Sequence, residues 1–485
     1  MPDDRVGAIE PVAASAVTFA ETVDVVVVGL GVAGTCAAIT AAEAGADVLA
    51  LERGVAAGGT SALSGGLIYL GGGTPVQTAC GYTDSAENME RFLLAAAGAR
   101  TDPAKIHAYC AGSVAHYHWL VEHGVPFKGR FNEEPNREPF DDSGLVFSGG
   151  EDSWPFTDVA DPVPRGHHPQ FPDTAGGFLM DRLAEARERS GATARTDTRA
   201  ERLVVDGGEV VGVVTSGDGA ERAVRVRGGV VLAAGGFVYN DAMLAHYCPP
   251  ALRPNEAWRV GQPNDDGRAI RLGQGVGAAL RNMDAVECAL PIGPPHRLAR
   301  ALLVNRDGRR FVNEDTYTGR IGMRALLEQD GEVYMVVSEE IFEVNFVGMR
   351  LQWAAETPEE LARDIGLPEA ALAETIRDYN AGAARGEDPE QHKLPPFVVP
   401  LRPPFGAVDL RVDGGAIYAP FTLGGLDTSL DGAVLDLDGA PIPGLFAAGR
   451  TTSGVAAQGY CSGLSLGDST LFGRIAGQSA AGVKP

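Results

Sequence analysis

The sequence has little that would support a disulfide framework, a metal site or a membrane span. Its six cysteines are widely scattered and form no Cys-x-x-Cys pair, so free thiols in a reducing compartment are expected. No stretch approaches the roughly 20 apolar residues that cross a bilayer. Residues 1–20 carry acids and lack the apolar run of a signal peptide. These absences predict a cytoplasmic protein with no bound metal and no membrane span.

Positive charge is scarce as well. Lysine and arginine number 40 against 64 aspartates and glutamates, which gives a formal net charge of −24. A field of this sign repels nucleic acids and anionic membranes. Neither is therefore expected as a partner, although a local basic pocket could still receive an anion.

What the sequence does contain is typical of a large globular enzyme. Hydrophobic residues make up 45% and charged residues 21% of the 485 residues, which excludes a disordered chain. This length exceeds one compact core, so it predicts two domains, or one large α/β domain with an insert. The 64 glycines fit a fold with many tight turns and with backbone close to a ligand.

The clearest local pattern is a strand, a helix and a second strand between Val23 and Glu52. The continuous β-branched run VDVVVVG predicts a buried parallel strand. An alanine-rich segment that ends at Gly45 predicts the helix, and ADVLALE predicts the second strand. Together they form a βαβ unit.

A glycine motif lies between the first strand and its helix. Gly29, Gly31 and Gly34 form G-x-G-x-x-G. The first allows a tight turn, the second lets the backbone approach a pyrophosphate, and the third allows close packing of helix and strand. The phosphates are expected at the helix N-terminus, where free N–H groups and the helix dipole favour negative charge. Glu52, about 20 residues further on, is the acid expected to hold ribose hydroxyls.

Three further segments distinguish a flavin from a nicotinamide nucleotide. ERGVAAGGTSALSGG (residues 52–66) brings glycines and hydroxyls directly after the ribose acid and is suited to lie along a flavin. VVLAAGGF (230–237) and GLFAAGRTTSG (444–454) predict strands that end in Ala-Gly, and a Gly-rich helix start follows the second. The predicted cofactor is FAD.

The predicted secondary-structure pattern changes twice beyond the βαβ unit. Residues 284–427 combine short strand patterns with two helical segments, after which strands and a closing helix return. We therefore predict an α/β fold in which a discontinuous Rossmann-like FAD-binding domain, residues 20–283 and 428–485, carries an inserted α+β substrate or catalytic domain at residues 284–427. Residues 130–175 are rich in Pro, Gly, Asp and Glu and are expected to form a functional loop or lid.

These features resemble the flavoprotein group that contains fumarate reductases and 3-ketosteroid dehydrogenases. Within it, the chain is similar to the 3-ketosteroid Δ4-(5α)-dehydrogenase family over most of its length, in GGTSALSGGLIYLGGG, CGYTDSAENMERFLLAA, DTAGGFLMD, FVNEDTYTGR and GRTTSGVAAQGYCSGLSLGDSTLFGRIAG. The G-Y-x-x-G core of the last segment also resembles the Δ1-dehydrogenases, whereas Y-x-S-G followed by L-G-D-S resembles the Δ4-(5α) enzymes. Because ALSGGLIYLGGG has no histidine where covalent flavoproteins of this group carry their attachment residue, FAD is expected to bind non-covalently.

The resemblance implies that a 3-ketosteroid with a saturated A ring loses a proton from carbon 4 and a hydride from carbon 5, which passes to N5 of FAD. Tyr460 matches the group that polarises the ketone, with a backbone N–H such as that of Gly463; one such donor is typically worth ~3 kcal/mol. Ser462 matches the base, and Tyr317 matches its partner, which either passes the proton on or stabilises the serine alkoxide. The sequence leaves open which of the two accepts the proton first.

The predicted cofactor site collects residues from all of these segments. Asp266 is included because the Asp265–Asp266 pair is similar to the family's turn before a helix, where an acid caps the helix or binds flavin. The site residues are Gly29, Gly31, Val32, Ala33, Gly34, Glu52, Arg53, Gly59, Thr60, Ser61, Gly65, Gly66, Ala234, Gly235, Asp266, Gly449, Ser465 and Leu466. The expected partners are a small, apolar, steroid-like ketone as substrate and an unidentified electron acceptor.

A fumarate or urocanate reductase is the first alternative. That branch carries His-His-Thr before its Gly-Gly pair and an arginine in the closing motif, which bind a carboxylate substrate. Here Pro420, Phe421 and Thr422 precede the Gly-Gly pair, and Ser465 stands where the arginine would be. An anionic substrate would therefore lose its main charge-assisted contacts.

Three further alternatives stay open. A 3-ketosteroid Δ1-dehydrogenase would use the same donors on a different pair of carbons, and Ser462 argues against it only moderately. A flavoprotein of the same build that acts on another cyclic ketone or enone would share these motifs. A non-catalytic flavin or electron carrier would need none of Tyr317, Tyr460 and Ser462. Without the resemblance, Tyr317 is more often an interface or packing residue, and Tyr460 and Ser462 read equally as capping and packing groups.

Overall fold

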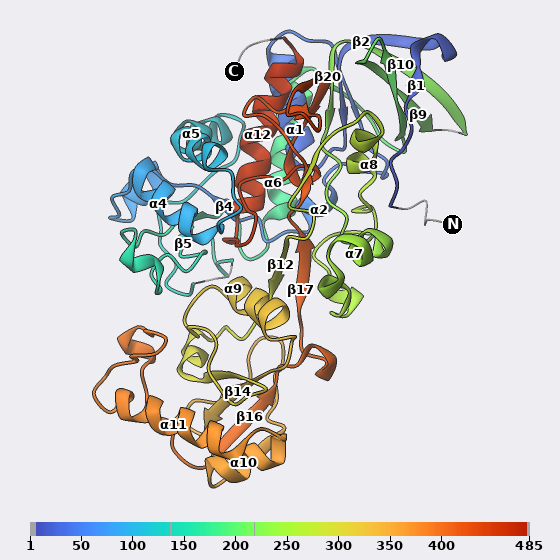
Figure 1. Ribbon diagram of the computed structural model, residues 1–485. Coiled ribbons are helices and arrows are strands. Elements are labelled where there is room, and N and C mark those ends of the chain that lie inside the picture. The colour runs from blue at the N-terminus through green and yellow to red at the C-terminus, as the bar shows by residue number, and fades with distance from the viewer. Residues whose placement is uncertain (1–5, 136–137, 218, 483–485) are drawn as a thin grey trace.

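The computed structural model describes residues 6–135, 138–217 and 219–482. Figure 1 shows an upper lobe built on a large sheet and a lower lobe that carries α10 and α11. The strands β12 (Val286–Ala289) and β17 (Ala419–Thr422) run between the lobes as an antiparallel ribbon. Next to them, β11 (Leu280–Arg281) pairs with β18 (Gly425–Leu426).

The large sheet is mixed, with a parallel centre. Its main path is β1 (Val12–Ala13), β8 (Arg199–Asp206), β9 (Glu209–Gly217), β10 (Ala220–Leu232), β2 (Phe19–Val28), β3 (Val48–Leu51) and β7 (Thr193–Arg195). β2 lies parallel to both β3 and β10. β20 (Pro441–Ala447) joins the end of β10 in parallel and pairs with β19 (Ala433–Leu435).

The valine run of β2 is buried on both faces of this sheet. Val25 and Val27 pack with α1 (Val32–Glu43) and α12 (Leu464–Ala480). Val26 and Val28 pack on the other face with α7 (Asp241–Tyr247) and α8 (Arg268–Gly275). Because both faces are covered, the strand needs no polar alternation, which is why it reads as a continuous β-branched run.

Two glycines of α12 let it lie directly against α1. A Cβ on Gly473 would come 2.4 Å from the carbonyl oxygen of Ala33, and a Cβ on Gly477 would come 2.2 Å from that of Ala37. No larger side chain fits this contact without moving a helix. The helix that follows the glycine motif is therefore fixed by the last helix of the chain.

A helical layer flanks the upper lobe (Figure 1). It contains α3 (Pro75–Ala79), α4 (Ala86–Ala96) and α5 (Pro103–Glu122). A small antiparallel sheet of β4 (Ile68–Tyr69), β6 (Gly166–His167) and β5 (Leu145–Val146) lies within it. The helices α6 (Gly176–Ser190) and α2 (Gly59–Ala62) pack against each other, and α6 also packs against α1. The described part of residues 130–175, a region expected as a functional loop or lid, is mostly irregular and supplies β5 and β6.

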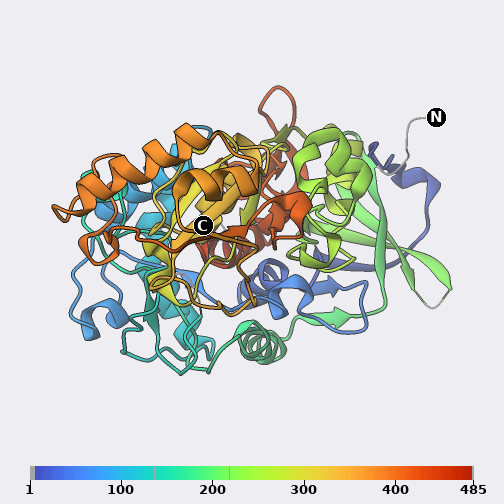
Figure 2. The same ribbon diagram turned by 90° about the horizontal axis from the view of Figure 1, so that it is seen from below.

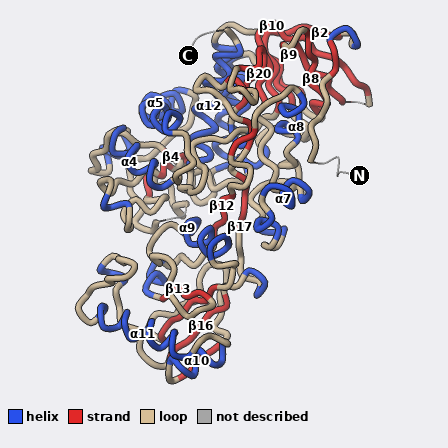
Figure 3. Tube along the Cα trace, in the orientation of Figure 1, coloured by secondary structure: helices blue, strands red, loops and turns tan. Residues whose placement is uncertain are grey.

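The lower lobe has its own antiparallel sheet, β13 (Leu302–Asn305), β14 (Val333–Ser338), β16 (Phe405–Asp409) and β15 (Trp353–Ala355). Figure 3 shows these strands at the opposite end of the molecule from the large sheet. The lobe also contains α9 (Thr318–Met323), α10 (Pro358–Ile365) and α11 (Glu369–Ala383). Viewed from below in Figure 2, the long α11 lies at the outside of the lobe, away from the N-terminus.

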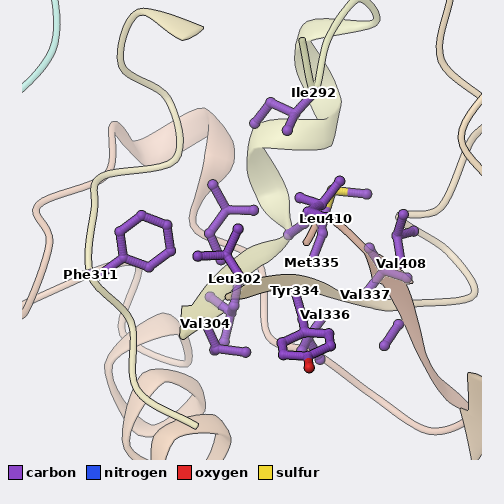
Figure 4. Close-up of a cluster of buried hydrophobic side chains, with 14 of the residues drawn as sticks. Ile292, Leu302, Val304, Phe311, Tyr334, Met335, Val336, Val337, Val408 and Leu410 are labelled. Carbon is purple, nitrogen blue, oxygen red and sulfur yellow. The ribbon is translucent and has the colours of Figure 1, made fainter. Parts of the chain in front are cut away.

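The lower lobe also has its own hydrophobic core. One cluster of buried hydrophobic residues draws its members from between Cys288 and Tyr418. Figure 4 shows Leu302, Met335 and Val337 among them. The domain boundaries at residues 284 and 427 stay a prediction. Among the residues that the structure describes, no helix has both the length and the apolarity needed to cross a membrane.

Candidate active site

A cavity of about 420 Å³ extends over the carboxyl ends of β2, β3 and β10, the edge where open α/β sheets bind ligands. All of the predicted cofactor residues except Gly34 line it, and so do Tyr317, Tyr460, Ser462 and Gly463. Gly34 lies behind the wall: a Cβ there would come 1.8 Å from the carbonyl oxygen of Gly29. It therefore has the close-packing position that the motif assigns to its third glycine.

The start of α1 forms one wall of the cavity. Gly29 has a φ of 99°, which favours glycine, and turns the chain out of β2. A Cβ on Gly31 would find Ser61 Oγ as its nearest neighbour, at 3.4 Å. The backbone N–H of Val32 donates to the same Ser61 Oγ at 3.1 Å. Backbone, hydroxyl and helix terminus thus converge where a diphosphate would need donors.

Glu52 directly follows β3 beside this turn and is 7% exposed. Its Oε2 accepts from the backbone N–H of Leu30 at 3.0 Å, and its Oε1 accepts from that of Gly54 at 2.8 Å. Each carboxylate oxygen can accept a further bond, so the fixed acid can still hold ribose hydroxyls. Next to it, Arg53 Nη1 forms an ion pair with Asp266 Oδ2 at 2.9 Å.

Asp265, the neighbour of the predicted Asp266, connects three segments of the cavity wall. Its Oδ2 accepts from Thr60 Oγ1 at 2.6 Å and from Arg450 Nη2 at 2.9 Å. A Cβ on Gly235 would lie 2.2 Å from Asp265 Oδ1. Arg450 lines the cavity and was not predicted from the sequence, although it directly follows Gly449 in the Ala-Ala-Gly-Arg segment.

These residues fit a flavin dinucleotide. A helix N-terminus and a glycine turn suit the diphosphate, Glu52 suits the ribose, and the glycine- and hydroxyl-rich segment from Gly59 to Gly66 continues along the same cavity toward Tyr460 and Ser462. The described residues contain no group of three or more His, Cys, Asp or Glu side chains placed to hold a metal ion.

The two predicted catalytic segments meet at this end of the cavity. Tyr317 directly precedes α9, whereas Tyr460, Ser462 and Gly463 lie just before α12. The ring centroids of Tyr317 and Tyr460 are 6.4 Å apart. Phe421, from β17, packs edge-on against Tyr460 at 5.2 Å between centroids. Residues more than 140 positions apart in the sequence thus form one aromatic site.

The hydroxyl of Tyr460 is oriented by the backbone. It accepts a hydrogen bond from the N–H of Ser465 at 3.1 Å, in the first turn of α12. Burial raises the pKa of Tyr460 above its ordinary value, only partly opposed by that hydrogen bond. The residue is therefore a neutral phenol at physiological pH, with its own proton available for donation.

Ser462 is fixed by the loop at residues 148–151. Its backbone N–H donates to the carbonyl of Ser148, and Ser148 Oγ donates back to the carbonyl of Ser462, both at 2.9 Å. Glu151 Oε2 in turn accepts from the N–H groups of Ser148 at 3.2 Å and Gly149 at 2.8 Å. This part of the region 130–175 supports the proposed catalytic serine.

Glu287 is a site residue that sequence reasoning missed. It lies on β12, is 1% exposed, and lines the cavity. The hydroxyl of Tyr317 donates to its Oε1 at 3.1 Å. The only sequence signal is an acid within the apolar segment AVECAL, and without its tertiary partners that pattern indicates no particular role.

A family model described as "FAD binding domain" matches residues 24–465. The chain belongs to this family. It is thus an FAD-dependent oxidoreductase, which confirms the predicted cofactor and α/β fold class. Whether FAD is held non-covalently stays a prediction.

The chain is similar to a solved structure of a 3-ketosteroid-delta4-(5alpha)-dehydrogenase from Rhodococcus jostii RHA1, with 48% sequence identity, 98% of this chain and 100% of that chain covered, and a TM-score of 0.93. This match confirms the family resemblance seen in the sequence.

Curated relatives are similar in sequence over most of this chain. The 4-oxocyclohexanecarboxylate 2-dehydrogenase of Sinomonas cyclohexanicum is 30% identical over 95% of this chain and 93% of its own length. A probable fumarate reductase, Ifc3 of Shewanella frigidimarina, is 29% identical over 95% of this chain and 75% of its own length. Other curated relatives are longer, and the chain spans about half of their length.

Proposed function

We propose that this protein is a 3-ketosteroid Δ4-(5α)-dehydrogenase. The observation that carries the proposal is that Tyr317, Tyr460, Ser462 and Gly463 line the same cavity as the residues that fit FAD. The similar solved structure is that of a Δ4-(5α)-dehydrogenase in complex with 4-androstene-3,17-dione. A second relative acts, by its name, on a cyclic ketone, so dehydrogenation beside a ring ketone is common to both.

Tyr460 is the group that polarises the ketone. Its oxygen already accepts from the backbone N–H of Ser465, so its own O–H is free to donate to the 3-keto oxygen. Donation lowers the cost of negative charge on that oxygen as the carbon 4 proton leaves, an effect worth ~3 kcal/mol for one preorganised donor. The N–H of Gly463, at the N-cap of α12, is the second donor in this proposal.

Ser462 and Tyr317 remove the proton. A serine hydroxyl is too weak a base to act alone, and burial raises the pKa of Tyr317 well above its ordinary value, so neither is a preformed anion. The proton therefore has to pass from carbon 4 through these hydroxyls to a further acceptor. Bound FAD supplies the hydride acceptor for the hydrogen on carbon 5.

A carboxylate substrate is disfavoured by the charges around the cavity. Arg450, which lines the cavity, is held by Asp265 at 2.9 Å. Pro420, Phe421 and Ser465 stand where the fumarate reductase branch carries histidines and arginine, and Phe421 packs against Tyr460. This end of the cavity therefore suits an apolar ring with one carbonyl group.

The test is anaerobic reduction of the protein-bound FAD by 5α-androstane-3,17-dione, followed as bleaching of the yellow flavin. Wild-type protein is expected to bleach rapidly. Tyr460→Phe and Ser462→Ala are each expected to slow the bleaching by roughly 10²–10³-fold, because each removes a group that acts on the leaving proton or its charge.

Tyr247→Phe, on α7 outside the cavity, is the matched control and is expected to bleach like wild type. Product analysis then separates the candidates: a double bond between carbons 4 and 5 supports the proposal, whereas one between carbons 1 and 2 indicates a Δ1-dehydrogenase. Bleaching that is unaffected in both site variants would contradict the catalytic roles and leave the cofactor unaffected.

A further inference from the structure

Glu287 is a buried acid that the proposed reaction leaves without a role. Its side chain projects from β12 toward the start of α9, and only Oε1 has a hydrogen-bond partner, the hydroxyl of Tyr317 at 3.1 Å. Oε2 is buried and has no hydrogen-bond partner within the part of the chain that the structure describes. A half-satisfied buried carboxyl is costly to the fold, so its place beside the site calls for a function.

The fold makes room for this carboxyl with glycine. A Cβ on Gly319 would lie 1.8 Å from Glu287 Oε1, and a Cβ on Gly322 would lie 2.0 Å from the carbonyl oxygen of Cys288. The first turns of α9 therefore lie directly on β12. Any larger residue at position 319 would push the carboxyl away from Tyr317.

The titratable groups that face Glu287 come from α9 and from the turns before α9 and α12, whereas β17 places the non-titratable Phe421 opposite Glu287. α9 contributes Arg320, whose guanidinium lies 4.1 Å from the Phe156 ring centroid and whose positive charge favours the ionised form of Glu287. The turn before α9 contributes Tyr317, and the turn before α12 contributes Tyr460 and Cys461. Of these groups only Arg320 is charged at neutral pH.

Burial outweighs the attraction of Arg320 and the hydrogen bond from Tyr317. The pKa of Glu287 rises from 4.5 to about 8. The carboxyl is therefore an acid that changes its protonation state close to physiological pH, as a group that receives and releases protons must.

We propose that Glu287 is the proton acceptor behind Tyr317 and that it receives the hydrogen removed from carbon 4. This inference rests on the proposed dehydrogenation. Glu287 acts through Tyr317 rather than on the substrate. It is the end of a short proton relay that begins in the cavity.

The transfer balances as follows. The carbon 4–hydrogen bond breaks, and its electron pair becomes the new double bond to carbon 5 as the hydride leaves carbon 5 for FAD. The released proton joins the Ser462 oxygen, the Ser462 proton joins the Tyr317 oxygen, and the Tyr317 proton joins the Glu287 carboxylate. Both hydroxyls end as they began, and Glu287 ends as a neutral acid that must return its proton to solvent before the next turnover.

The central experiment is the pH dependence of flavin bleaching by 5α-androstane-3,17-dione in stopped flow. In wild type the rate is expected to rise with pH through about 8, because only the carboxylate form accepts a proton. Glu287→Gln keeps an oxygen that accepts from Tyr317 but cannot take the proton. Its rate is expected to fall by roughly 10²-fold or more and to lose this rise with pH.

Two further variants separate proton transfer from packing. Glu287→Asp keeps a carboxyl and is expected to restore the rise with pH at a reduced rate. In the background of Tyr317→Phe, Glu287→Gln is expected to have no further effect, because residues that act in one chain are not additive. Glu374→Gln, a half-buried acid on α11 outside the cavity, is the control that should leave rate and pH dependence unchanged.

A readout that needs no turnover is infrared titration of the resting protein. Wild type is expected to lose a carboxylic acid band as pH rises through about 8, and Glu287→Gln should lack that band. The proposal fails if Glu287→Gln bleaches like wild type, or if it is slower but keeps the wild-type pH dependence. If the wild-type flavin is not bleached at all, the proposed function fails first and the relay fails with it.

Discussion

The same residue type has opposite tasks at two positions of this site. Burial raises the pKa of both Tyr317 and Tyr460, so both are neutral phenols. Their hydrogen-bond partners differ: the Tyr460 oxygen accepts from a backbone N–H, which leaves its own O–H for a ligand, whereas the Tyr317 hydroxyl donates to Oε1 of Glu287. A phenol that already donates cannot polarise a ketone, and one that already accepts is poised to do so.

At the residue scale, we expect Glu287→Gln to stabilise the fold at high pH. The folded-state pKa of about 8 lies above the ordinary 4.5, so the folded state binds this proton more tightly than the unfolded chain. The stabilisation from protonated Glu287 is complete below pH 4.5 and is lost as pH rises through about 8. Glutamine cannot ionise and escapes that loss.

The measurement is the melting temperature of both proteins between pH 4.5 and 9. The advantage of Glu287→Gln should grow across this range, up to a few kcal/mol in unfolding free energy. Glu374→Gln, outside the cavity on α11, should show no such trend. A difference between Glu287→Gln and wild type that does not change with pH would contradict the expectation.

At the scale of elements, close contacts between helices and strands determine where the site lies. α12 contacts α1 through Gly473 and Gly477, and the chain just before α12 carries Tyr460 and Ser462. α9 approaches β12 through Gly319 and Gly322, which places Tyr317 beside Glu287. In both cases glycines, which have no side chain, allow the close contact that places the functional groups.

Gly473→Ala is therefore expected to weaken FAD binding. Its Cβ would lie 2.4 Å from the carbonyl oxygen of Ala33, which itself lines the cavity, so the start of α1 must shift. Overpacking of this kind costs about 1–3 kcal/mol, which corresponds to roughly 5- to 150-fold in affinity. Titration of the apoprotein with FAD, followed by quenching of flavin fluorescence, measures the effect.

Gly7→Ala is the matched control, since a Cβ at Gly7 has no atom within 4 Å and its φ needs no glycine. An FAD affinity in Gly473→Ala equal to that of Gly7→Ala would show that the contact between α1 and α12 does not position the cofactor site.

At the scale of the whole molecule, the site lies where the two lobes meet. Glu287 comes from the strand that enters the lower lobe, and Tyr317 from the turn before α9 of that lobe. Tyr460 and Ser462 come from the segment before α12 of the upper lobe, and Phe421 from the strand that returns between the lobes. Ligand binding at such a junction adds contacts that neither lobe makes alone.

We expect removal of FAD to lower the melting temperature and its return to restore it in proportion to FAD concentration. Free FAD at 100 times its Kd stabilises the fold by about 2.7 kcal/mol. Riboflavin lacks the diphosphate and adenosine that α1 and Glu52 are built to hold, so at equal concentration it should restore much less. Equal recovery with riboflavin would show that the α1 end of the cavity does not bind the cofactor.

The sequence by itself determined the part of this protein that is expected to bind the cofactor. The strand, glycine turn and helix from Val23 to Glu43, and the acid at Glu52, follow from short-range patterns, because backbone pairing and phosphate binding at a helix start depend on neighbours in the chain. The closing segment around Tyr460 and Ser462 could also be identified, since its residues are contiguous and resemble a known family.

Only the tertiary structure decided how the residues proposed to take up the proton are arranged. Glu287 looks like any acid in a short strand until α9 and the segment before α12 enclose it, and the support of Ser462 by Ser148 joins residues 314 positions apart. These relations depend on burial and on contacts between segments far apart in sequence. Burial shifts a pKa and a partner directs a hydroxyl, and neither is set by the identity of the residue alone.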